Sequence, residues 1–470
     1  MSVRRLYGMH DKKWATFFFI LLGLWSLVLL STVISRVNGF YGLVDYSVDL
    51  SFLTTPLLGI VLIYTVVTMF IFVAYLLTIK KAKKYQRSKY ESLSTLPERS
   101  KDLTSLFNQN GMNNRICSII IPSRNEETVI RRTVTECLKQ TYPYIEIIVV
   151  CHNCSDRTFE EAQVSDPRVR VFDLKTKEVG KGIALNYGVE QSKGKYLLIL
   201  DGDGTLSSNF IELALPMITG NCAAVQGRYM PSNRNYNLLT RLLSIEGDLW
   251  STPFMTVRSV MDKRCPLGGT GYIVRKDALK AVGLFENHLV DDFELTFRLL
   301  RNKYRIAFAP LCIDYDEKPP ALDIMFRQRS RWAKGFMSLL KSRITEKTDI
   351  LGYFSWLWPV ASLASLVMLL IPAYSVIHYL LYEYYPFTYS YLSLNLWIIL
   401  NVIMYGLQGA VLIKEHGIHA AKYIPYLFLY NAFSQYAFIA YVKGFFIKSW
   451  ANTKTQHGFL QKLEKSLIAK

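Results

Sequence analysis

The chain has 470 residues, of which 51% are hydrophobic, 14% are aromatic and 20% are charged. It carries 55 Lys and Arg against 37 Asp and Glu, which gives a formal net charge of +18 at pH 7. The apolar fraction excludes a disordered chain, and seven cysteines are too few for a disulfide scaffold of this length. Long apolar stretches near both ends also exclude an ordinary soluble enzyme.

Two apolar stretches without charged residues lie near the N-terminus, at residues 14–35 and 57–79. Each is long enough for a transmembrane helix, which needs about 20 residues to cross about 30 Å of hydrocarbon. Lys and Arg precede the first stretch and follow the second, whereas the connection 36–56 carries one Arg and two Asp. The positive-inside rule therefore predicts a hairpin over residues 1–79, with both flanks in the cytoplasm.

Residues 80–115 are polar and basic, and they are predicted to form a juxtamembrane linker. Residues 80–101 alone hold eight Lys or Arg against two Glu. Attraction to anionic membrane lipids accounts for this excess of positive charge. Nucleic acid is not a predicted partner, because no nucleic-acid-binding motif accompanies the basic residues.

Residues 116–345 are predicted to form an α/β domain with a doubly wound, mostly parallel sheet. Short runs rich in Ile and Val alternate with helical patterns, an order typical of such sheets. The predicted strands are 116–121, 145–150, 169–172, 196–200 and 223–226, and the predicted helices include 126–140, 181–191 and 207–218. Ligands of these sheets bind beyond the carboxyl ends of the strands, so polar residues there are candidate site residues.

The motif Asp201-Gly202-Asp203 directly follows the predicted strand 196–200. Two carboxylates one residue apart at a strand end are suited to hold Mg²⁺ or Mn²⁺ against a diphosphate. The alternative interpretation is an Asp-Gly turn with a solvated second carboxylate.

A second acidic pair, Asp291-Asp292, opens a predicted helix after an apolar Leu-Val dipeptide. Adjacent carboxylates at a helix start often do no more than complement the helix dipole. Near a metal-bound phosphate, one of them could instead act as the general base for an attacking hydroxyl.

Three arginines within five residues precede Trp332, in the helical segment 327–332. Guanidinium groups match phosphate oxygens, and a tryptophan ring offers a flat face to a sugar. The alternative is a basic amphipathic helix on the lipid surface, and both interpretations can hold at once.

Three weaker features complete the candidate site. Lys181, at the start of the predicted helix 181–191, is a candidate phosphate contact. Gly269 and Thr270 lie in a glycine-rich segment that permits close approach of the backbone to a substrate. Cys151 and Cys154 have C-x-x-C spacing, but a structural zinc ion needs two more ligands that the sequence does not supply. They are predicted to be buried thiols.

Residues 346–450 are predicted to hold C-terminal transmembrane helices, with spans at 354–381, 394–413 and 423–446. The connection 383–390 has no Lys or Arg and is predicted to be external, whereas Lys414 and Lys422 mark the next turn as cytoplasmic. If 423–446 is a full span, the three C-terminal spans place the C-terminus outside the cell. The basic tail 451–470 instead favours a cytoplasmic C-terminus. Segment 423–446 is therefore either a span or an interfacial or re-entrant segment.

Taken together, these motifs resemble a membrane-embedded family-2 glycosyltransferase with a GT-A domain. Segment 119–126 resembles the first strand and nucleotide loop of that family. The other matches are Asp201-Gly202-Asp203 with D-x-D, Val290-Asp291-Asp292 with T-E-D, and Gln328-Arg329-Ser330-Arg331-Trp332 with Q-x-x-R-W. The last two motifs are typical of synthases for cellulose, chitin, hyaluronan and poly-N-acetylglucosamine. Two positions depart from the pattern: Cys151-His152 replaces an acidic pair, and Asp291 replaces a Glu.

The resemblance implies a role for each matching residue. Asp292 would be the catalytic base with Asp291 beside it, and Asp201 and Asp203 would hold Mg²⁺ or Mn²⁺. The residues implied in donor binding are Pro122, Ser123, Asn125, Glu126, Asp156, Lys181, Asp201, Gln328 and Arg331. Those implied in acceptor binding are Trp332, Gly269 and Thr270.

The implied activity is an inverting transfer from a nucleotide sugar, a UDP-hexose, that builds and exports a β-linked polysaccharide. The implied partners are the growing glycan, membrane lipids and an accessory export protein, and the implied location is the cell membrane, multi-pass, with a cytoplasmic catalytic domain. The nearest alternative is a single addition to a membrane lipid acceptor, such as a ceramide or a polyprenyl phosphate. A catalytically silent export partner and a transporter are weaker alternatives, because the chain keeps the carboxylates that the chemistry needs.

Overall fold

The computed structural model describes residues 51–94, 116–262, 264–343 and 394–433, together with Ala440 and Lys443. The predicted spans 14–35 and 354–381 and the tail 451–470 lie outside the described residues, and the predicted span 423–446 is described only in part. The chain divides into two compact units. The first comprises Met1–Ala74 and Ile350–Ile439, and the second comprises Tyr75–Asp349 and Ala440–Lys470.

An eight-stranded mixed sheet, with the strand order β3-β2-β1-β4-β7-β6-β8-β5, forms the centre of the second unit. Neighbours are parallel from β3 to β4 and between β6 and β8, whereas β7 runs antiparallel to both β4 and β6, and β5 antiparallel to β8. The strands are β1 (Cys117–Ser123), β2 (Ile145–His152), β3 (Val169–Leu174), β4 (Tyr196–Ile199), β5 (Thr205–Leu206), β6 (Cys222–Pro231), β7 (Tyr272–Arg275) and β8 (Arg305–Asp316).

The predicted α/β class is confirmed, but the prediction of a doubly wound, mostly parallel sheet needs correction. Each of the five predicted strands is present, and the reversed strand β7 in the middle makes the sheet mixed. Strands β5, β7 and β8 were not predicted. β5 has two residues and β7 has four, and Pro310 interrupts the apolar pattern of β8.

Helices lie between the strands of this unit, as the alternating pattern predicts. The predicted helix 181–191 is α6, whereas the predicted helix 126–140 is shortened to α4. The predicted helix 207–218 splits into α7 and the 3₁₀ turn η2, where Pro216 cannot donate a backbone hydrogen bond. The helices are α4 (Ile130–Cys137), α5 (Thr158–Ala162), α6 (Lys181–Gln191), α7 (Phe210–Ala214), η2 (Leu215–Met217), α8 (Leu238–Glu246), η3 (Gly247–Ser251), α9 (Thr252–Asp262), α10 (Lys276–Ala281), α11 (Asp291–Arg301) and α12 (Leu322–Arg343).

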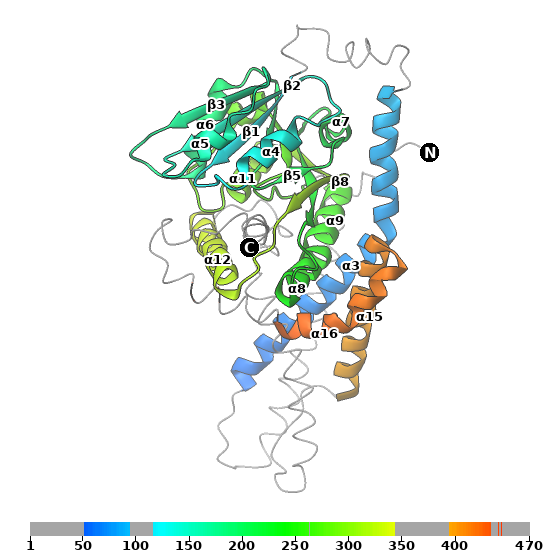
Figure 1. Ribbon diagram of the computed structural model, residues 1–470. Helices are drawn as coiled ribbons and strands as arrows, with labels where there is room; N and C mark the ends of the chain where they lie inside the picture. Colours follow the sequence, from blue (N-terminus) through cyan, green and yellow to red (C-terminus); the bar gives the residue numbers. More distant parts are fainter. Residues whose placement is uncertain are drawn as a thin grey trace, which may run out of the picture. The chain divides into compact units, whose positions relative to one another are not determined.

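Both faces of the sheet are buried, as the apolar run in β1 shows. Ile119 and Ile121 pack with residues of α4 in one cluster, whereas Ile120 packs with residues of α6 in another (Figure 1). Successive side chains of a strand point to opposite faces, so three consecutive isoleucines fill two layers. Each such buried side chain contributes about 1.5–3 kcal/mol, which fixes β1 at the centre of the domain.

The helix α3 (Ser51–Ser94) continues beyond the predicted span 57–79, through residues predicted to be a linker. Residues 80–94 contain no Gly or Pro and are rich in the good helix formers Lys, Gln, Arg and Glu. Gln86 is fully buried, and its amide donates to Leu213 O (3.3 Å) and to Cys312 Sγ (3.1 Å). Its Oε1 accepts from Leu311 N (2.9 Å), so α3 is joined to the end of α7 and to β8.

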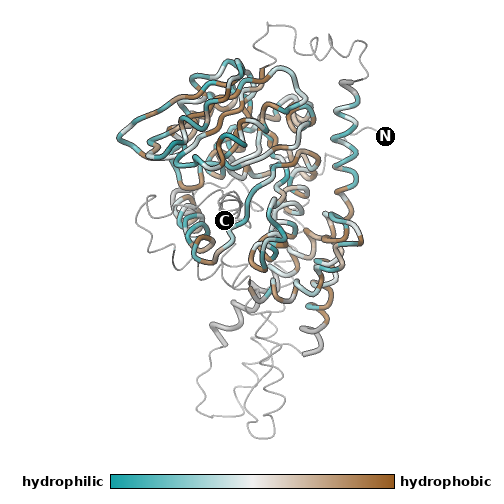
Figure 2. Tube along the Cα trace, viewed as in Figure 1, coloured by the Kyte–Doolittle hydropathy of each residue, from teal (hydrophilic) through white to brown (hydrophobic). Residues whose placement is uncertain are grey.

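The described part of the first unit is helical. Besides the start of α3 it holds α15 (Leu394–His416), the 3₁₀ turn η4 (Ile418–Tyr423) and α16 (Ile424–Phe433). Apolar side chains on α15 are exposed, among them Val402 at 65% and Ile399 at 53%, and Figure 2 shows the hydrophobic character of this helix. Among the described residues, one helix, Tyr64–Glu91 within α3, is long and apolar enough to cross a membrane. The multi-pass topology therefore stays a prediction.

Candidate active site

The Asp201-Gly202-Asp203 segment lies just beyond β4, near the middle of the sheet. Two hydroxyl groups hold its backbone: Asp201 N donates to Thr270 Oγ1 (3.0 Å), and Thr133 Oγ1 donates to Gly202 O (2.8 Å). Glu126 packs so closely that a Cβ on Gly202 would lie 1.5 Å from Glu126 Oε2. The sequence Asp-Gly-Asp thus gives two carboxylates around a position that has no room for a side chain.

Lys181, the first residue of α6, places its ammonium group between Asp201 and the loop 268–271. Its Nζ donates to Asp201 Oδ1 (2.5 Å) and to Gly269 O (2.8 Å). Burial acts to lower the pKa of Lys181, but the charges of Asp201 and Asp291 outweigh burial and raise that pKa above its ordinary value. Lys181 therefore keeps a full positive charge beside the carboxylates.

Asp291 and Asp292 are the first two residues of α11. Burial, followed by the charge of Asp291, raises the pKa of Asp292 to about 7. Burial also raises the pKa of Asp291, against the effect of Lys181. Asp292 faces the loop 268–271: a Cβ on Gly269 would lie 3.4 Å from Asp292 Oδ2, and the φ of Gly269 is +84°, a conformation that favours glycine.

Helix α12 brings Arg331 to the same carboxylates. Burial lowers the pKa of Arg331, and the charges of Asp201, Asp291 and Asp292 oppose that effect, so the guanidinium lies within electrostatic reach of all three. Two residues earlier, Arg329 donates to Glu246 Oε2 (2.8 Å) and lies 4.3 Å from the centroid of the Trp332 ring. One face of Trp332 is therefore covered by an arginine of its own helix.

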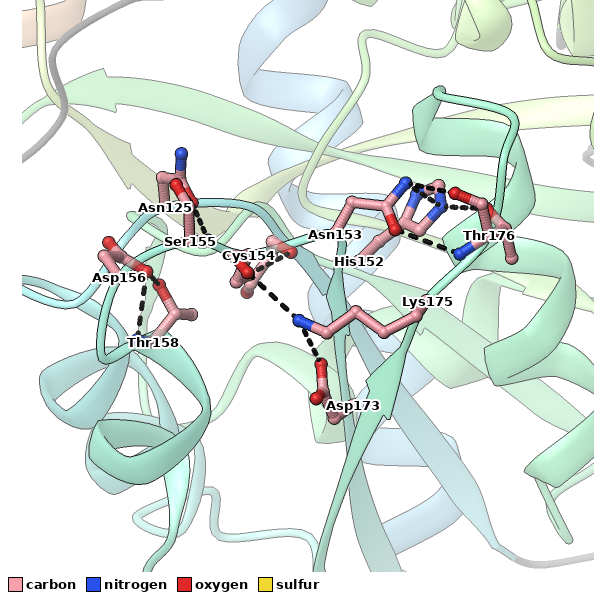
Figure 3. A network of polar contacts seen from close by, with 11 residues as sticks. Asn125, His152, Asn153, Cys154, Ser155, Asp156, Thr158, Asp173, Lys175 and Thr176 are labelled. Carbon is pink, nitrogen blue, oxygen red and sulfur yellow. Dashed lines mark hydrogen bonds and ion pairs between the residues drawn. The ribbon is translucent and has the colours of Figure 1, made fainter.

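The ends of β1 and β2 form a second group of polar contacts, which Figure 3 shows from close by. Asn125, in a left-handed conformation with φ of 59°, accepts from Ser155 N through Oδ1 (2.8 Å). Asp156 Oδ1 accepts from Thr158 N (3.1 Å) at the start of α5, and Asp156 Oδ2 accepts from Glu127 N (3.3 Å). These bonds tie the loop after β1 to the loop after β2, so both keep a defined shape.

Cys151 and His152 fill the positions where the resemblance implies an acidic pair. Cys151 is fully buried, and the thiols of Cys151 and Cys154 are hydrogen-bonded to each other. His152 Nε2 lies 2.7 Å from Thr176 Oγ1, and burial lowers the pKa of His152. A neutral imidazole and two cysteines therefore line this part of the loop in place of carboxylates, and the hydrogen bond with Cys151 lowers the pKa of Cys154 to about 7.

The chemistry of the carboxylates at β4 and α11 suits a divalent cation that is shared with a substrate. In the part of the chain that the structure describes, no three His, Cys, Asp or Glu side chains converge on one metal position. Mg²⁺ in phosphate sites is bound by one or two carboxylates, with water and substrate phosphates as its other ligands. Burial is the first cause that raises the pKa of both Asp291 and Asp292, and the charge of a neighbouring carboxylate (Asp201 for Asp291, Asp291 for Asp292) raises each pKa further.

Comparison with known proteins identifies the domain that carries this site. Residues 114–335 match the profile of the family described as "Glycosyltransferase like family 2". The match covers a little under half of the chain, and the matched region is named the glycosyltransferase domain after it. The prediction of a glycosyltransferase is thereby confirmed at the level of the domain, and the mixed sheet is its GT-A-like core.

Curated relatives of the glycosyltransferase domain differ in what their names say they make. The "Probable glycosyltransferase YdaM" of Bacillus subtilis is 32% identical over 229 residues, 46% of this chain and 54% of that protein. The "Beta-monoglucosyldiacylglycerol synthase" of Trichormus variabilis is 27% identical over 277 residues, 53% of this chain and 58% of that protein. The "Poly-beta-1,6-N-acetyl-D-glucosamine synthase" of Staphylococcus epidermidis is 25% identical over 223 residues, 46% of this chain and 54% of that protein.

The match thus spans a little over half of the length of these relatives. Among solved structures, the mannosyltransferase PcManGT from Pyrobaculum calidifontis, in complex with GDP-Man and Mn²⁺, overlaps with a TM-score of 0.48 at 16% identity. That overlap covers 81% of this chain and 100% of the mannosyltransferase chain.

Within the glycosyltransferase domain, most of the predicted site residues lie in two connected groups. The first surrounds Asp201 and comprises Lys181, Gly269, Thr270, Asp291, Asp292 and Arg331. The second, at the ends of β1 and β2, comprises Pro122, Ser123, Asn125, Glu126 and Asp156, and Glu126 connects it to Gly202. Asp203 follows Gly202 and is half-buried, and Gln328 and Trp332 share α12 with Arg331. Their roles remain predictions.

The sequence analysis missed three polar residues of the glycosyltransferase domain that lie against the loop 268–271, and two of them, Gln226 and Tyr229, hold its backbone. Gln226 Oε1 accepts from Gly268 N (3.0 Å), and Gln226 Nε2 donates to Thr270 O (3.0 Å). Tyr229 Oη lies 2.5 Å from Gly268 O and 3.0 Å from Thr270 O. Asp314 is fully buried on β8, and burial, followed by the charges of Asp316 and Asp201, raises its pKa well above the ordinary value. A polar residue inside an apolar strand was the available signal for Gln226 and Asp314.

Proposed function

We propose that the chain is an inverting hexosyltransferase that transfers a sugar from a UDP-linked donor to an acceptor hydroxyl. Asp292 carries the proposal, because its pKa is about 7 at the mouth of a cluster that holds Lys181, Asp201 and Arg331. A general base is most effective when its pKa lies near the working pH. An ordinary aspartate, with a pKa of about 3.9, would be a far weaker base.

In the proposed reaction, Asp292 takes the proton of the acceptor hydroxyl as the oxygen attacks the anomeric carbon. The bond from that carbon to the diphosphate oxygen breaks, and an α-linked donor gives a β-linked product. Lys181 and Arg331 supply positive charge near the departing diphosphate. Mg²⁺ or Mn²⁺, held by Asp201 and Asp203, would add the charge that makes nucleoside diphosphate a good leaving group.

We further propose that the product is a β-linked polysaccharide that leaves the cell through the membrane-spanning part of the chain. Support comes from the Q-x-x-R-W sequence on α12, from the exposed apolar side chains on α15, and from the similarity to a poly-N-acetylglucosamine synthase. Membrane lipids and an accessory export protein are the proposed partners. The catalytic domain is then cytoplasmic, where nucleotide sugars are made.

A second candidate function is a single transfer to a membrane lipid. The similarity to glucosyldiacylglycerol synthases, which extends over 277 residues, supports this alternative. Both functions use the same base and the same donor, and they differ in the acceptor and in the number of sugars added.

The proposed base is tested with Asp292→Asn in the detergent-purified full chain, assayed with UDP-sugars and Mn²⁺. Release of nucleoside diphosphate is expected to fall by about 10²–10⁴-fold, because general base catalysis contributes that factor. Donor binding, measured by isothermal titration calorimetry, should stay within about threefold of wild type. The matched control is Asp277→Asn, a carboxyl on α10 paired with Arg275, which should keep full activity. Loss of donor binding in Asp292→Asn would indicate a structural role instead.

The size of the product separates the two acceptor classes. A long product that a β-glycosidase degrades is expected from the polysaccharide synthase. A short product that partitions into organic solvent would overturn that proposal in favour of the lipid acceptor.

A further inference from the structure

Helix α12 packs against the start of α11, where the proposed base lies. A Cβ on Gly335 would lie 2.7 Å from Val290 Cγ1, so α12 has no room for a side chain beside the residue that precedes Asp291-Asp292. Directly after that pair, the ring of Phe293 meets the ring of Phe336 edge to face, with 4.8 Å between their centroids. Residues 335 and 336 of α12 therefore lie beside the segment that carries the proposed base.

Trp332 lies one turn before Gly335 on the same face of α12, because residues three and four apart on a helix are neighbours. Arg329 lies one further turn back, and its guanidinium carbon is 4.3 Å from the centroid of the Trp332 ring. The Trp332 side chain is partly exposed, with the guanidinium over one face of its ring. A sugar that stacks on Trp332 must therefore use the other face.

Arg329 is itself held from outside α12, by Glu246 at the end of α8. Its Nη2 donates to Glu246 Oε2 (2.8 Å), and the two side chains are only 10% and 13% exposed. Glu246 directly precedes η3, which is a π-helical turn, and such turns are frequent at functional sites. A buried ion pair is weak evidence of added stability, because the removal of two charges from water offsets their attraction. The geometry that the pair fixes is the better reason for its presence.

We propose that Glu246 is a positioning residue for the acceptor, acting through Arg329 to fix the plane of the Trp332 ring beside Asp292. The inference rests on the proposed function and on the predicted role of Trp332 in acceptor binding. A guanidinium plane that a carboxylate holds at one end keeps the indole ring in one orientation. Without that support, the acceptor hydroxyl is displaced from the anomeric carbon and water attacks in its place. Asp292 then takes the proton of water, and free hexose and nucleoside diphosphate are the products.

The test compares transfer with donor hydrolysis. The detergent-purified full chain is supplied with Mn²⁺, a membrane lipid extract and each of a panel of radiolabelled UDP-hexoses, and the ratio of labelled glycan or glycolipid to free labelled hexose is measured. Trp332→Ala, Glu246→Ala and Arg329→Lys are each expected to lower this ratio about 10-fold, because a small misplacement of a reactant is costly to its transfer. Donor binding, measured by isothermal titration calorimetry, should stay within about threefold of wild type, because the donor does not use this ring.

Arg329→Lys separates positioning from structural support. Lysine keeps a positive charge for Glu246 but has no plane to stack on the indole ring, so a role confined to the ion pair would leave the ratio unchanged. The double variant Glu246→Ala with Trp332→Ala should have the same ratio as Trp332→Ala alone, because Glu246 acts through that ring. The matched control is Asp323→Asn, which removes a carboxylate from the exposed ion pair with Arg327 on the same helix and should leave the ratio unchanged.

A wild-type ratio in Glu246→Ala or Arg329→Lys, together with a lowered ratio in Trp332→Ala, overturns the positioning role and leaves the proposed function intact. A parallel loss of transfer, hydrolysis and donor binding also overturns it, since that result indicates a structural role. If Glu246→Ala fails to fold, Arg329→Lys decides the question alone. A wild-type ratio in Trp332→Ala overturns the acceptor role of Trp332 and the inference with it. Failure of the wild-type chain to release nucleoside diphosphate from any UDP-hexose contradicts the proposed function itself.

Discussion

The surroundings of Asp292 raise the pKa of its carboxyl group, which makes its carboxylate a stronger base than that of an ordinary aspartate. Its burial at the start of α11 and the adjacent charge of Asp291 both favour the protonated acid. The backbone N–H of Phe293 and the ammonium of Lys181 act in the opposite direction but are weaker. If Asp292 is the proposed base, Asp291 would therefore affect the reaction without touching a substrate.

The pH dependence of activity should reveal this coupling. Asp292 must be deprotonated to accept a proton, so kcat/KM is expected to rise as the pH increases through about 7. Asp291→Asn removes a neighbouring negative charge and lowers the pKa of Asp292, which should move the acidic limb of the profile down by about one pH unit. The measurement is the initial rate of nucleoside diphosphate release from pH 5 to pH 9 at saturating Mn²⁺. An acidic limb that stays in place in Asp291→Asn, as it should in the control Asp277→Asn, would contradict the coupling.

At the scale of elements, the C-terminal part of α3 belongs to the same unit as the sheet. Gln86 makes its three contacts with the end of α7 and with β8, and Tyr90 Oη donates to Glu212 Oε1 (3.0 Å) on α7. Gln86 accepts a hydrogen bond from the backbone N–H of Leu311. Leu311 lies in β8 between Ala309 and Ile313, where the pairing of β8 with β6 shifts in register. The helix thereby completes hydrogen bonding at the irregular middle of β8.

Removal of this contact should destabilise the catalytic unit. Gln86→Leu fills the same space but leaves Leu311 N without its acceptor, so the free energy of unfolding is expected to fall by about 1–3 kcal/mol. Urea unfolding followed by tryptophan fluorescence in detergent measures the change. Ser88→Ala on the exposed side of α3, where the hydroxyl only contacts Tyr85 O, should change it by less than about 0.5 kcal/mol. Equal stability of Gln86→Leu and wild type would show that α3 is not part of the folded unit.

The sequence predicts those elements whose pattern is local. β1, β2 and α6 were found because buried β-branched runs and helical periodicity need no knowledge of neighbours. β7 is four residues long and follows glycines, and β8 is broken by Pro310, so neither has a strong local signal. The reversal of β7, which makes the sheet mixed, depends on pairing between residues far apart in the chain.

The same limit applies to the candidate site. Asp201 was predicted because it follows an apolar strand-like run, and Asp292 because the pair Asp291-Asp292 opens a predicted helix after an apolar dipeptide. Asp314 lies 44 positions after Thr270 in the sequence, and only the pairing of β6 with both β7 and β8 brings the two together. The packing of Asp314 against the loop 268–271 cannot be predicted until the sheet order is known.

At the scale of the whole molecule, the two units differ in what they expose. The sheet unit buries its apolar side chains in two large clusters, whereas α15 leaves Ile399, Val402 and Ile403 exposed at 45–65%. Exposed apolar side chains that gather on one helix are typical of surfaces that contact lipid or another chain.

Membrane integration is therefore a prediction for the full chain. After expression, the protein should remain in the membrane pellet when membranes are washed with sodium carbonate at pH 11, and it should dissolve only in detergent, because a spanning helix inserts effectively irreversibly. An integral protein of known topology serves as the positive control and a salt-released peripheral protein as the negative one. Release of the chain by carbonate would show that it only associates with the membrane surface.

Strand β7 joins two halves of the sheet, β3-β2-β1-β4 on one side and β6-β8-β5 on the other. Asp201 and Lys181 come from the first half, whereas Gln226, Tyr229 and Asp314 come from the second. Contacts between segments so distant in sequence form late in folding, because their loop-closure entropy must be overcome first. During synthesis, the ribosome must have released β8 before Asp201 gains its complete set of neighbours. A nascent chain therefore cannot complete the proposed active site before the whole sheet has been made.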